Sequence, residues 1–182
     1  LQIRDSQGLP ITTAEVTRDL IYESSVTALI GGFSPANTRI MQALSEQAQV
    51  PFITSICTHF DITDSGNNFT FRSITDDRRQ FEALAEYAAR RFASRKPAII
   101  HDIELYGPDS AQKYVEISGR FGQQVCAAVS YRKGMINFRK QIETLMTANP
   151  DSLVILAPPA DAALITRHLR EARFNKPILG GN

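Results

Sequence analysis

The 182-residue sequence lacks the features that mark membrane-spanning, nucleic-acid-binding or disulfide-stabilised proteins. It contains no run of about 18 apolar residues, so no transmembrane helix is predicted. It contains 20 Lys and Arg and 19 Asp and Glu residues. The resulting formal net charge of +1 is too small to recruit nucleic acid or an anionic membrane. Leu1 begins a strand-like stretch without the charged and apolar regions of a signal peptide. The two cysteines, Cys57 and Cys126, fall in segments assigned below to different lobes, so we expect no disulfide.

Motifs for nucleotide binding, metal binding and nucleophilic catalysis are also missing. The glycines of GGFSPANT are followed neither by the Lys-Ser/Thr ending of a phosphate loop nor by the spacing of a dinucleotide fingerprint. His59 and Asp61 have no third ligand at useful spacing, so we expect no metal site. A triad of Ser55, His59 and Asp61 would place all its members on one short loop, without the strained turn that usually exposes a nucleophile. We therefore predict no catalytic residues and no cofactor.

The sequence does contain short β-rich runs that alternate with segments of helical period. This alternation is typical of βαβ units around a parallel sheet, and several runs are almost entirely apolar, as strands covered on both faces are. The predicted strands are LQIR (1–4), VTALI (26–30), PFIT (51–54), FTFR (69–72), PAII (97–100), VCAAVS (125–130), LVILA (153–157) and PIL (177–179). Apolar helix stripes lie between them, including Ile40, Met41, Leu44 and Ala48; Phe81, Leu84, Ala85, Ala88 and Phe92; Phe138, Ile142, Leu145 and Met146; and Leu164, Ile165, Leu169 and Ala172.

The alternation is interrupted between residues 55 and 80. That stretch has too many turn formers for a helix, and a new helix is predicted to open near Thr75 or Asp76, where Asp76 and Asp77 suit an N-terminus. We predict that the chain there leaves one α/β lobe, residues 1–73, and enters a second, residues 74–178. Residues 179–182 would begin a second crossing. The predicted fold class is α/β, with two doubly wound, flavodoxin-like parallel-sheet lobes.

Three strand-to-helix turns carry distinctive residues. In open parallel α/β sheets, ligands bind beyond the carboxyl ends of the strands, where helix N-termini present unpaired N–H groups. In GGFSPANTRI, Ser34 suits an N-cap and Pro35 a first helical position. Free N–H groups near Ala36 and Asn37 would hold a carboxylate there, although Ser-Pro also starts helices that bind nothing.

The other two turns follow the strands at 51–54 and 97–100. In TSICTHFD, an ammonium group could be bound by the hydroxyls of Thr54, Ser55 and Thr58 and by the backbone carbonyls. Alternatively, these polar groups form hydrogen bonds with one another within the turn. In ELYGPDSA, Gly107 lets the backbone turn into a helix and leaves Tyr106 projecting. A tyrosine there suits the wall of a cleft, or else it packs on its own lobe.

These turns, in this order and with a lobe change before the third, resemble the type I periplasmic solute-binding proteins of the branched-chain amino acid class. Matching stretches run along nearly the whole chain: LQIRDSQGLPITTAEVTRDLI, VTALIGGFSPANT, VPFITSICT, FTFRSITDD, AIIHDIELYGPDSA, INFRKQIETL and ITRHLREARFNKPILGG. Each motif is weak singly, and their collinear order carries the resemblance.

The resemblance implies a two-lobed protein that closes on a small solute held between its lobes. Matched residue by residue, the contacts of the first lobe fall on the Ser34–Pro35 turn, on the backbone of Ile56 and on Thr58. The aromatic residue of the opposing lobe falls on Tyr106. The class commonly has a serine where this chain has Pro35, so Ser34 or the helix N-terminus would hold a ligand carboxylate instead.

The same resemblance implies non-catalytic binding of an amino acid or a similar small carboxylate, in the periplasm, for the membrane permease of an ABC importer. No nucleic-acid partner is implied. The matching stretches correspond to the middle portion of such a protein. We therefore expect an incomplete first lobe whose exposed strand edges invite pairing with another copy.

Two alternatives remain open at this stage. The same fold could be the ligand-sensing domain of a larger signalling receptor, which would differ only in what is attached to it. A flavodoxin-like enzyme would use His101, Asp102 or Glu104 for acid–base chemistry at the end of the strand at 97–100. No phosphate-cradling glycine pattern accompanies these three residues.

Overall fold

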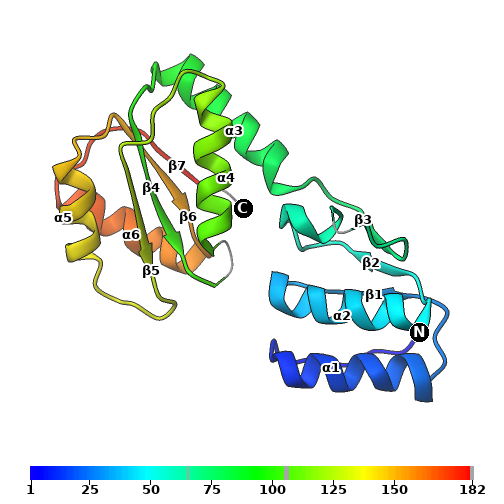
Figure 1. Ribbon diagram of the computed structural model, residues 1–182. Coiled ribbons are helices and arrows are strands. Elements are labelled where there is room, and N and C mark those ends of the chain that lie inside the picture. Colours follow the sequence, from blue (N-terminus) through cyan, green and yellow to red (C-terminus); the bar gives the residue numbers. More distant parts are fainter. Residues whose placement is uncertain (65, 105–106, 181–182) are drawn as a thin grey trace. The chain divides into compact units, whose positions relative to one another are not determined.

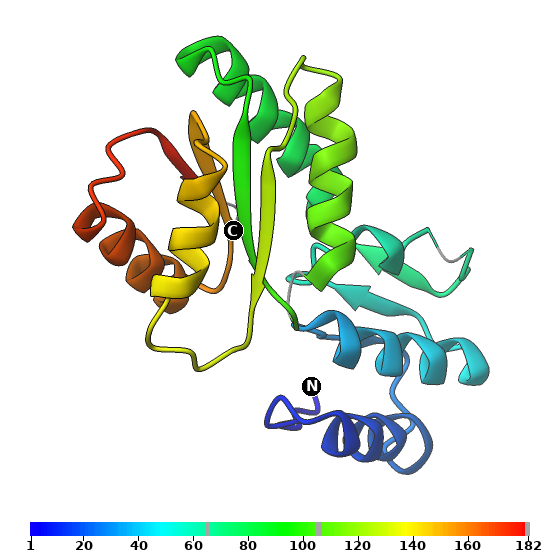
Figure 2. The ribbon, with the colours of Figure 1, turned by 60° about the vertical axis from the view of Figure 1, so that its left-hand side comes forward.

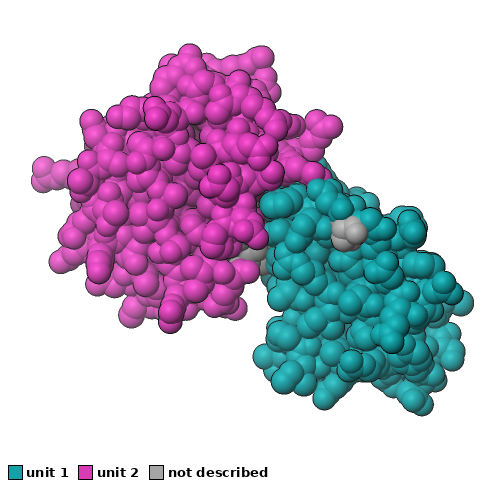
Figure 3. All heavy atoms as spheres, in the orientation of Figure 1, with its two compact units in different colours: residues 1–77 teal, residues 78–182 magenta. Residues whose placement is uncertain are grey.

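The computed structural model describes residues 1–64, 66–104 and 107–180 (Figure 1). The chain divides into two compact units, Leu1–Asp77 and Arg78–Asn182, which Figure 3 colours separately. Each unit contains one parallel sheet, three-stranded in the first and four-stranded in the second. The α/β class with parallel sheets is confirmed.

The first unit carries its sheet in the order β1-β2-β3. Its elements are α1 (Pro10–Arg18), the π-helical turn η1 (Asp19–Glu23), β1 (Leu29–Ile30), α2 (Pro35–Ala48), β2 (Phe52–Thr54), the 3₁₀ turn η2 (Phe60–Ile62) and β3 (Thr70–Arg72). The described residues between β2 and β3 form no α-helix, in agreement with the predicted interruption.

A small apolar core joins one face of this sheet to the helices. Leu44 of α2 packs with Leu29, Phe52 and Ile21, and the predicted stripe residues Ile40, Met41 and Ala48 lie against the same cluster. Helix α1 packs beside α2 (Figure 1). The buried face of α1 is polar: the hydroxyls of Thr13 and Thr17 donate to carbonyls four residues back. The sequence pattern did not reveal this helix because its buried positions are not apolar.

The strand predicted from LQIR is wrong. Residues 1–6 have no regular structure, and Leu1 and Ile3 are exposed. A strand is stabilised by the ladder of hydrogen bonds to a neighbour, and no described strand pairs with these residues. Arg4 instead forms an ion pair with Asp19, with 2.6 Å between its Nε and the carboxylate.

The second unit carries a sheet in the order β5-β4-β6-β7. Its elements are α3 (Asp77–Phe92), β4 (Pro97–Asp102), α4 (Gly107–Gly119), β5 (Ala127–Tyr131), α5 (Arg139–Thr147), β6 (Ser152–Leu156), α6 (Pro159–Glu171) and β7 (Ile178–Gly180). The predicted strands other than LQIR are all present, with ends displaced by up to a few residues. None of the described helices combines the length and apolar character needed to cross a bilayer.

Both faces of this second sheet are covered, which explains its continuously apolar central strands. Ile99, Val154 and Leu156 pack against α3 and α4, whereas the alternate residues Ile100, Leu153 and Ile155 pack with residues of α5 and α6 (Figure 1 and Figure 2). The predicted helix stripes supply these contacts through Phe81, Ala85, Ile142, Leu145, Ile165 and Leu169. Phe92 and Met146, which end two stripes, are exposed.

Candidate functional site

The carboxyl ends of β1, β2 and β3 lie at one edge of the first sheet, because the three strands are parallel. The loops that follow β1 and β2 are joined there: Thr54 Oγ1 donates to the carbonyl of Gly32 at 3.3 Å. The third strand is tied in by the Ser73 N–H, which donates to the carbonyl of Thr54 at 3.1 Å. The first two predicted turns are therefore neighbours in space.

The predicted helix start at Ser34 and Pro35 is confirmed. Ser34 is the N-cap of α2, and its Oγ accepts from the Asn37 N–H at 3.3 Å, while Pro35 is buried at the first helical position. The Asn37 N–H is therefore occupied, contrary to the expectation that it would be free. The N–H of Ala36 has no acceptor within the helix, because the first turn of a helix has none.

Gly32 fixes how the first loop meets α2. Its φ of +80° lies in the left-handed region, and a Cβ built there would lie 2.6 Å from Thr38 Oγ1. Thr38 in turn donates to the carbonyl of Ser34 through both its N–H and its hydroxyl. The backbone of the loop therefore lies directly against the first turn of the helix.

The second loop, residues 55–59, is held mainly through its backbone. The Cys57 N–H donates to Thr54 Oγ1 at 3.3 Å, and the buried Cys57 thiol has a pKa raised by that burial. Arg72, at the end of β3, donates to the carbonyls of Cys57 at 3.3 Å and His59 at 2.8 Å. Ile56 is 54% exposed, so the loop presents this residue to solvent.

Thr58 is linked to the buried carboxylate of Asp77, for which the sequence predicted only a place at the start of a helix. Its carbonyl accepts from the Asp77 N–H at 2.9 Å, and its hydroxyl donates to the Asp77 carboxylate. Asp77 is 2% exposed, and burial raises its pKa despite the opposing effects of Thr58, His59 and Arg72. Asp77 Oδ1 has no hydrogen-bond partner within the part of the chain that the structure describes.

One signal in the sequence could have identified Asp77. It follows β3 closely, and the carboxyl end of β3 lies at the same edge as the two predicted turns. A carboxylate at such a strand end is a candidate for the site as well as for the start of α3.

His59 and Asp61 interact with each other next to the second loop, and Asp61 also pairs with α2. His59 Nδ1 lies 2.5 Å from Asp61 Oδ1, and Arg39 of α2 donates to Asp61 Oδ2. Burial would raise the pKa of Asp61, but Arg39 and His59 outweigh it and hold that pKa below its usual value. Among the described residues, no three His, Cys, Asp or Glu side chains are placed to hold a metal ion. The pair thus serves to fasten the loop to α2.

In the second unit, the strand ends carry polar residues in separate roles. Tyr106, predicted to contact the ligand, lies outside the described residues. His101 and Asp102 are buried, with His101 Nδ1 2.8 Å from the carbonyl of Asp102, while Glu104 is exposed. The carboxylates proposed for acid–base chemistry therefore occupy different environments.

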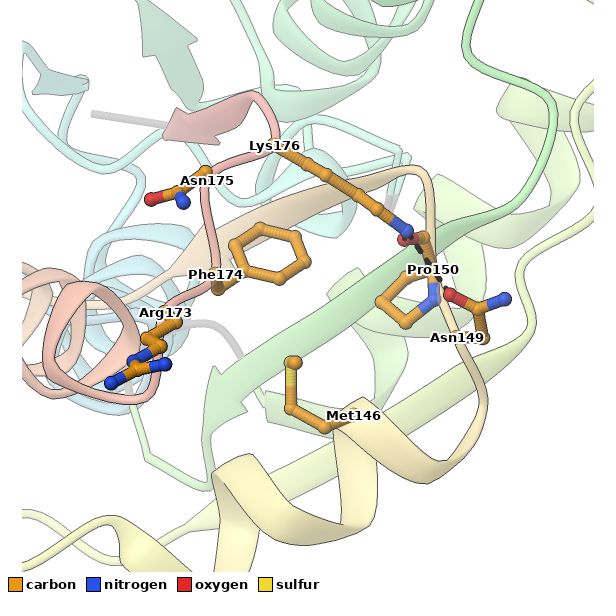
Figure 4. A pocket seen from close by; sticks show the side chains of 7 residues that line it. All are labelled: Met146, Asn149, Pro150, Arg173, Phe174, Asn175 and Lys176. Carbon is orange, nitrogen blue, oxygen red and sulfur yellow. Dashed lines mark hydrogen bonds between the residues drawn. The ribbon is translucent and has the colours of Figure 1, made fainter.

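A pocket in the second unit lies at the opposite ends of the strands from His101 and Asp102 (Figure 4). It has a volume of about 130 Å³ and is lined by Met146, Asn149, Pro150, Arg173, Phe174, Asn175 and Lys176. These residues precede β6 and β7, so the pocket is at the amino ends of the strands. Lys176 spans it, and its Nζ donates to Asn149 Oδ1 at 3.1 Å and to the carbonyl of Pro150. The pocket contains none of the predicted site residues.

Comparison with curated proteins gives two informative relatives. The Leu/Ile/Val-binding protein homolog 3 of Brucella melitensis is 27% identical over 142 residues, which is 78% of this chain and 38% of that protein. Glutamate receptor 2.1 of Arabidopsis thaliana is 23% identical over 128 residues, or 70% of this chain and 14% of the receptor.

Solved structures match over almost the whole chain. The leucine-binding protein LivK of Thermotoga maritima has a TM-score of 0.89 and 26% identity, covering 97% of this chain and 50% of that one. A solute-binding protein of an ABC transporter from Rhodopseudomonas palustris, in complex with 3,4-dihydroxybenzoic acid, has a TM-score of 0.83 at 18% identity, covering 98% and 50%. The chain thus spans about half the length of these structural relatives.

The family comparison agrees with these likenesses and with the predicted type I fold. Residues 1–180 match the family described as periplasmic binding protein. This chain therefore belongs to the periplasmic binding protein family.

Proposed function

We propose that the protein binds a small carboxylate-bearing solute, best exemplified by an amino acid, and releases it chemically unchanged. The observation that carries this proposal is the pairing, at one sheet edge, of a helix N-terminus with a loop of acceptors next to a buried carboxylate. An amino acid needs both halves of such a site, because its carboxylate seeks donors and its ammonium seeks acceptors.

The donor half lies at the start of α2. The N–H of Ala36 and the hydroxyl of Ser34 would hold the carboxylate, favoured by the partial positive charge of the helix N-terminus. Pro35 is buried and has no N–H, so its role would be to shape the turn. This assignment gives Ser34 the anchoring part that the family resemblance left open.

The acceptor half lies on the second loop. The hydroxyl of Thr58 donates to Asp77, so its oxygen lone pairs would be left for a donor on the solute. The backbone carbonyl of Ile56 would be a second acceptor. The charge of Asp77, buried behind Thr58, would favour a cationic group at this position.

We further assign the two compact units to the two predicted lobes, with the solute held between them and Tyr106 closing over it from the second lobe. Binding would shift an equilibrium between open and closed lobes, and the closed form would dock on the permease of an ABC importer from the periplasm. The similarity to leucine-binding and ABC-transporter solute-binding proteins supports this assignment.

A thermal-shift screen tests the proposal. The panel contains L-leucine, L-isoleucine, L-glutamate, benzoate and 3,4-dihydroxybenzoate, and at least one member should raise the melting temperature, by an amount that grows with its concentration. A second measurement follows the bound compound by mass spectrometry, which should recover it unaltered. If no panel member raised the melting temperature, the binding of amino-acid-like carboxylates would be abandoned.

A second candidate function is ligand sensing within a larger receptor. The likeness to glutamate receptor 2.1 favours it, since that alignment covers 70% of this chain but 14% of the receptor. The two functions predict the same ligand site and differ in the attached segments. A signalling or transmembrane segment encoded in the same reading frame would favour the receptor.

We also propose that two copies of the chain pair with each other. An exposed apolar face of the first sheet supports this proposal. Ile30, Ile53 and Phe71 are register partners on one face, with Ile30 70% and Phe71 53% exposed, while Leu29, Phe52 and Thr70 on the other face are buried. Parallel sheets are normally covered on both faces. Sedimentation should reveal a concentration-dependent dimer that Phe71→Thr weakens, and a strictly monomeric species would oppose pairing.

A further inference from the structure

We propose that Arg72 is a positioning residue for the ligand loop: its guanidinium binds the carbonyls of Cys57, His59 and Phe60. That of Ile56 is left for the solute. This inference rests on the proposed function for its ligand half, but its structural half stands on hydrogen bonds alone. Arg72 is the last residue of β3, so a rigid strand carries it to the loop.

The Arg72 guanidinium donates hydrogen bonds to several acceptors of the loop at once, an arrangement called the clamp below. One terminal nitrogen donates to the carbonyls of Cys57 at 3.3 Å and His59 at 2.8 Å. The other donates to the Phe60 carbonyl at 3.5 Å and to Thr63 Oγ1 at 2.5 Å. Four acceptors on a single irregular segment thus converge on one side chain.

The carbonyls of residues 56–60 can be accounted for one by one. Those of Cys57, His59 and Phe60 are directed to Arg72, and that of Thr58 accepts from the Asp77 N–H. Of these five carbonyls, that of Ile56 is the one without a hydrogen-bond partner among the described residues. The clamp therefore selects which carbonyl of the loop remains for a ligand.

Arginine suits this role for a physical reason. Its planar guanidinium presents five donors in a fixed fork, whereas a lysine ammonium is a point charge with rotatable donors on a flexible stem. A lysine at position 72 keeps the positive charge near Asp77 but cannot direct donors to the same set of carbonyls. Comparing Arg72→Lys with Arg72→Met therefore separates loss of the fork from loss of the charge.

Amide hydrogen exchange tests the structural half without any ligand. Arg72→Met and Arg72→Lys should each raise exchange of the Cys57 and Asp77 amides about tenfold, since both amides bond within the clamped region. The Leu29 and Phe52 amides, bonded within the sheet, should keep their rates. Arg4→Met is the matched control, because Arg4 pairs with Asp19 and does not bond to the loop.

Calorimetry with L-leucine tests the ligand half. Both Arg72 variants should bind L-leucine about tenfold more weakly than the wild type, and Arg4→Met should bind equally well. Unchanged loop exchange, or a rise that is uniform across the sheet amides, would overturn the clamp. Faster loop exchange with unchanged L-leucine affinity would overturn its role in binding. If the wild type itself bound no L-leucine, leucine would be excluded as the solute, and exchange alone would decide the role of Arg72.

Discussion

The hydroxyl of Thr58 would form two hydrogen bonds in the proposed site, one to the Asp77 carboxylate and one to the solute. A hydroxyl has one hydrogen to donate, and here that hydrogen is directed to Asp77. Its oxygen is thereby left as an acceptor. At this position the site should therefore prefer a solute that offers a donor.

Thr58→Val tests that bond. Removing the hydroxyl should weaken binding of the best solute of the panel by about 1.5–3 kcal/mol, the usual range for a hydrogen bond to a charged group. Thr27→Val is a matched control on an exposed residue of the same unit. Calorimetry measures the affinities, and circular dichroism checks that the variants are folded. Equal affinity in both variants would move the site away from Thr58.

The raised pKa of Asp77 predicts a pH dependence of binding. Burial holds that pKa above its usual value, against the influence of Thr58, His59 and Arg72 and with that of Asp76. The carboxylate is charged above its folded pKa and neutral below it, so affinity for an ammonium-bearing solute should rise as pH increases through that pKa.

Calorimetry with L-leucine between about pH 4 and pH 7 measures this dependence, because the range begins near the unperturbed carboxyl pKa. Asp77→Asn should flatten the profile and lower the affinity at the upper end. A wild-type profile that is flat, or that survives in Asp77→Asn, would assign the charge to another group.

At the residue level, the sequence predicted part of the local structure around the candidate site. Ser34 was predicted as the N-cap because a Ser-Pro pair has strong local preferences, and the structure confirms it. Asp77 was read only as a helix-start residue, because its burial and its bond to Thr58 arise from tertiary packing. Arg72 was missed for the same reason, since its partners lie 9 to 15 residues earlier in the chain.

Among the elements, the start of α2 bears most directly on the site. Gly32→Ala should destabilise the protein by about 1–3 kcal/mol, because alanine there combines a left-handed φ with a clash against Thr38. Gly8→Ala is the control: its φ of +70° is similar, but a Cβ there has no neighbour within 4 Å. Urea unfolding of both variants isolates the clash, and equal losses would mean that Thr38 moves aside freely.

The elements also separate what sequence pattern can predict from what it cannot. The strands of the second unit were predicted well because β4 and β6 are buried on both faces and therefore nearly all apolar. Helix α1 was not predicted, because Thr13 and Thr17 are its buried residues. The LQIR segment was wrongly predicted as a strand because its composition suits one, whereas pairing depends on a neighbouring strand.

For the molecule as a whole, family membership and fold are established, and the ligand site is proposed at the carboxyl edges of both units. In that proposal the first unit would contribute Ser34, Ile56 and Thr58, and the second would contribute Tyr106. The pocket at the amino ends of β6 and β7 is the competing location, because it is concave, although Lys176 already fills part of it.

The most direct measurement is an amide chemical-shift map recorded while the best-binding solute of the panel is titrated into the labelled protein. The proposed site predicts saturable shifts at Ser34, Ile56 and Thr58 and at the first turn of α4, with Asn149 and Lys176 unmoved. Shifts confined to Asn149, Lys176 and their neighbours would contradict it.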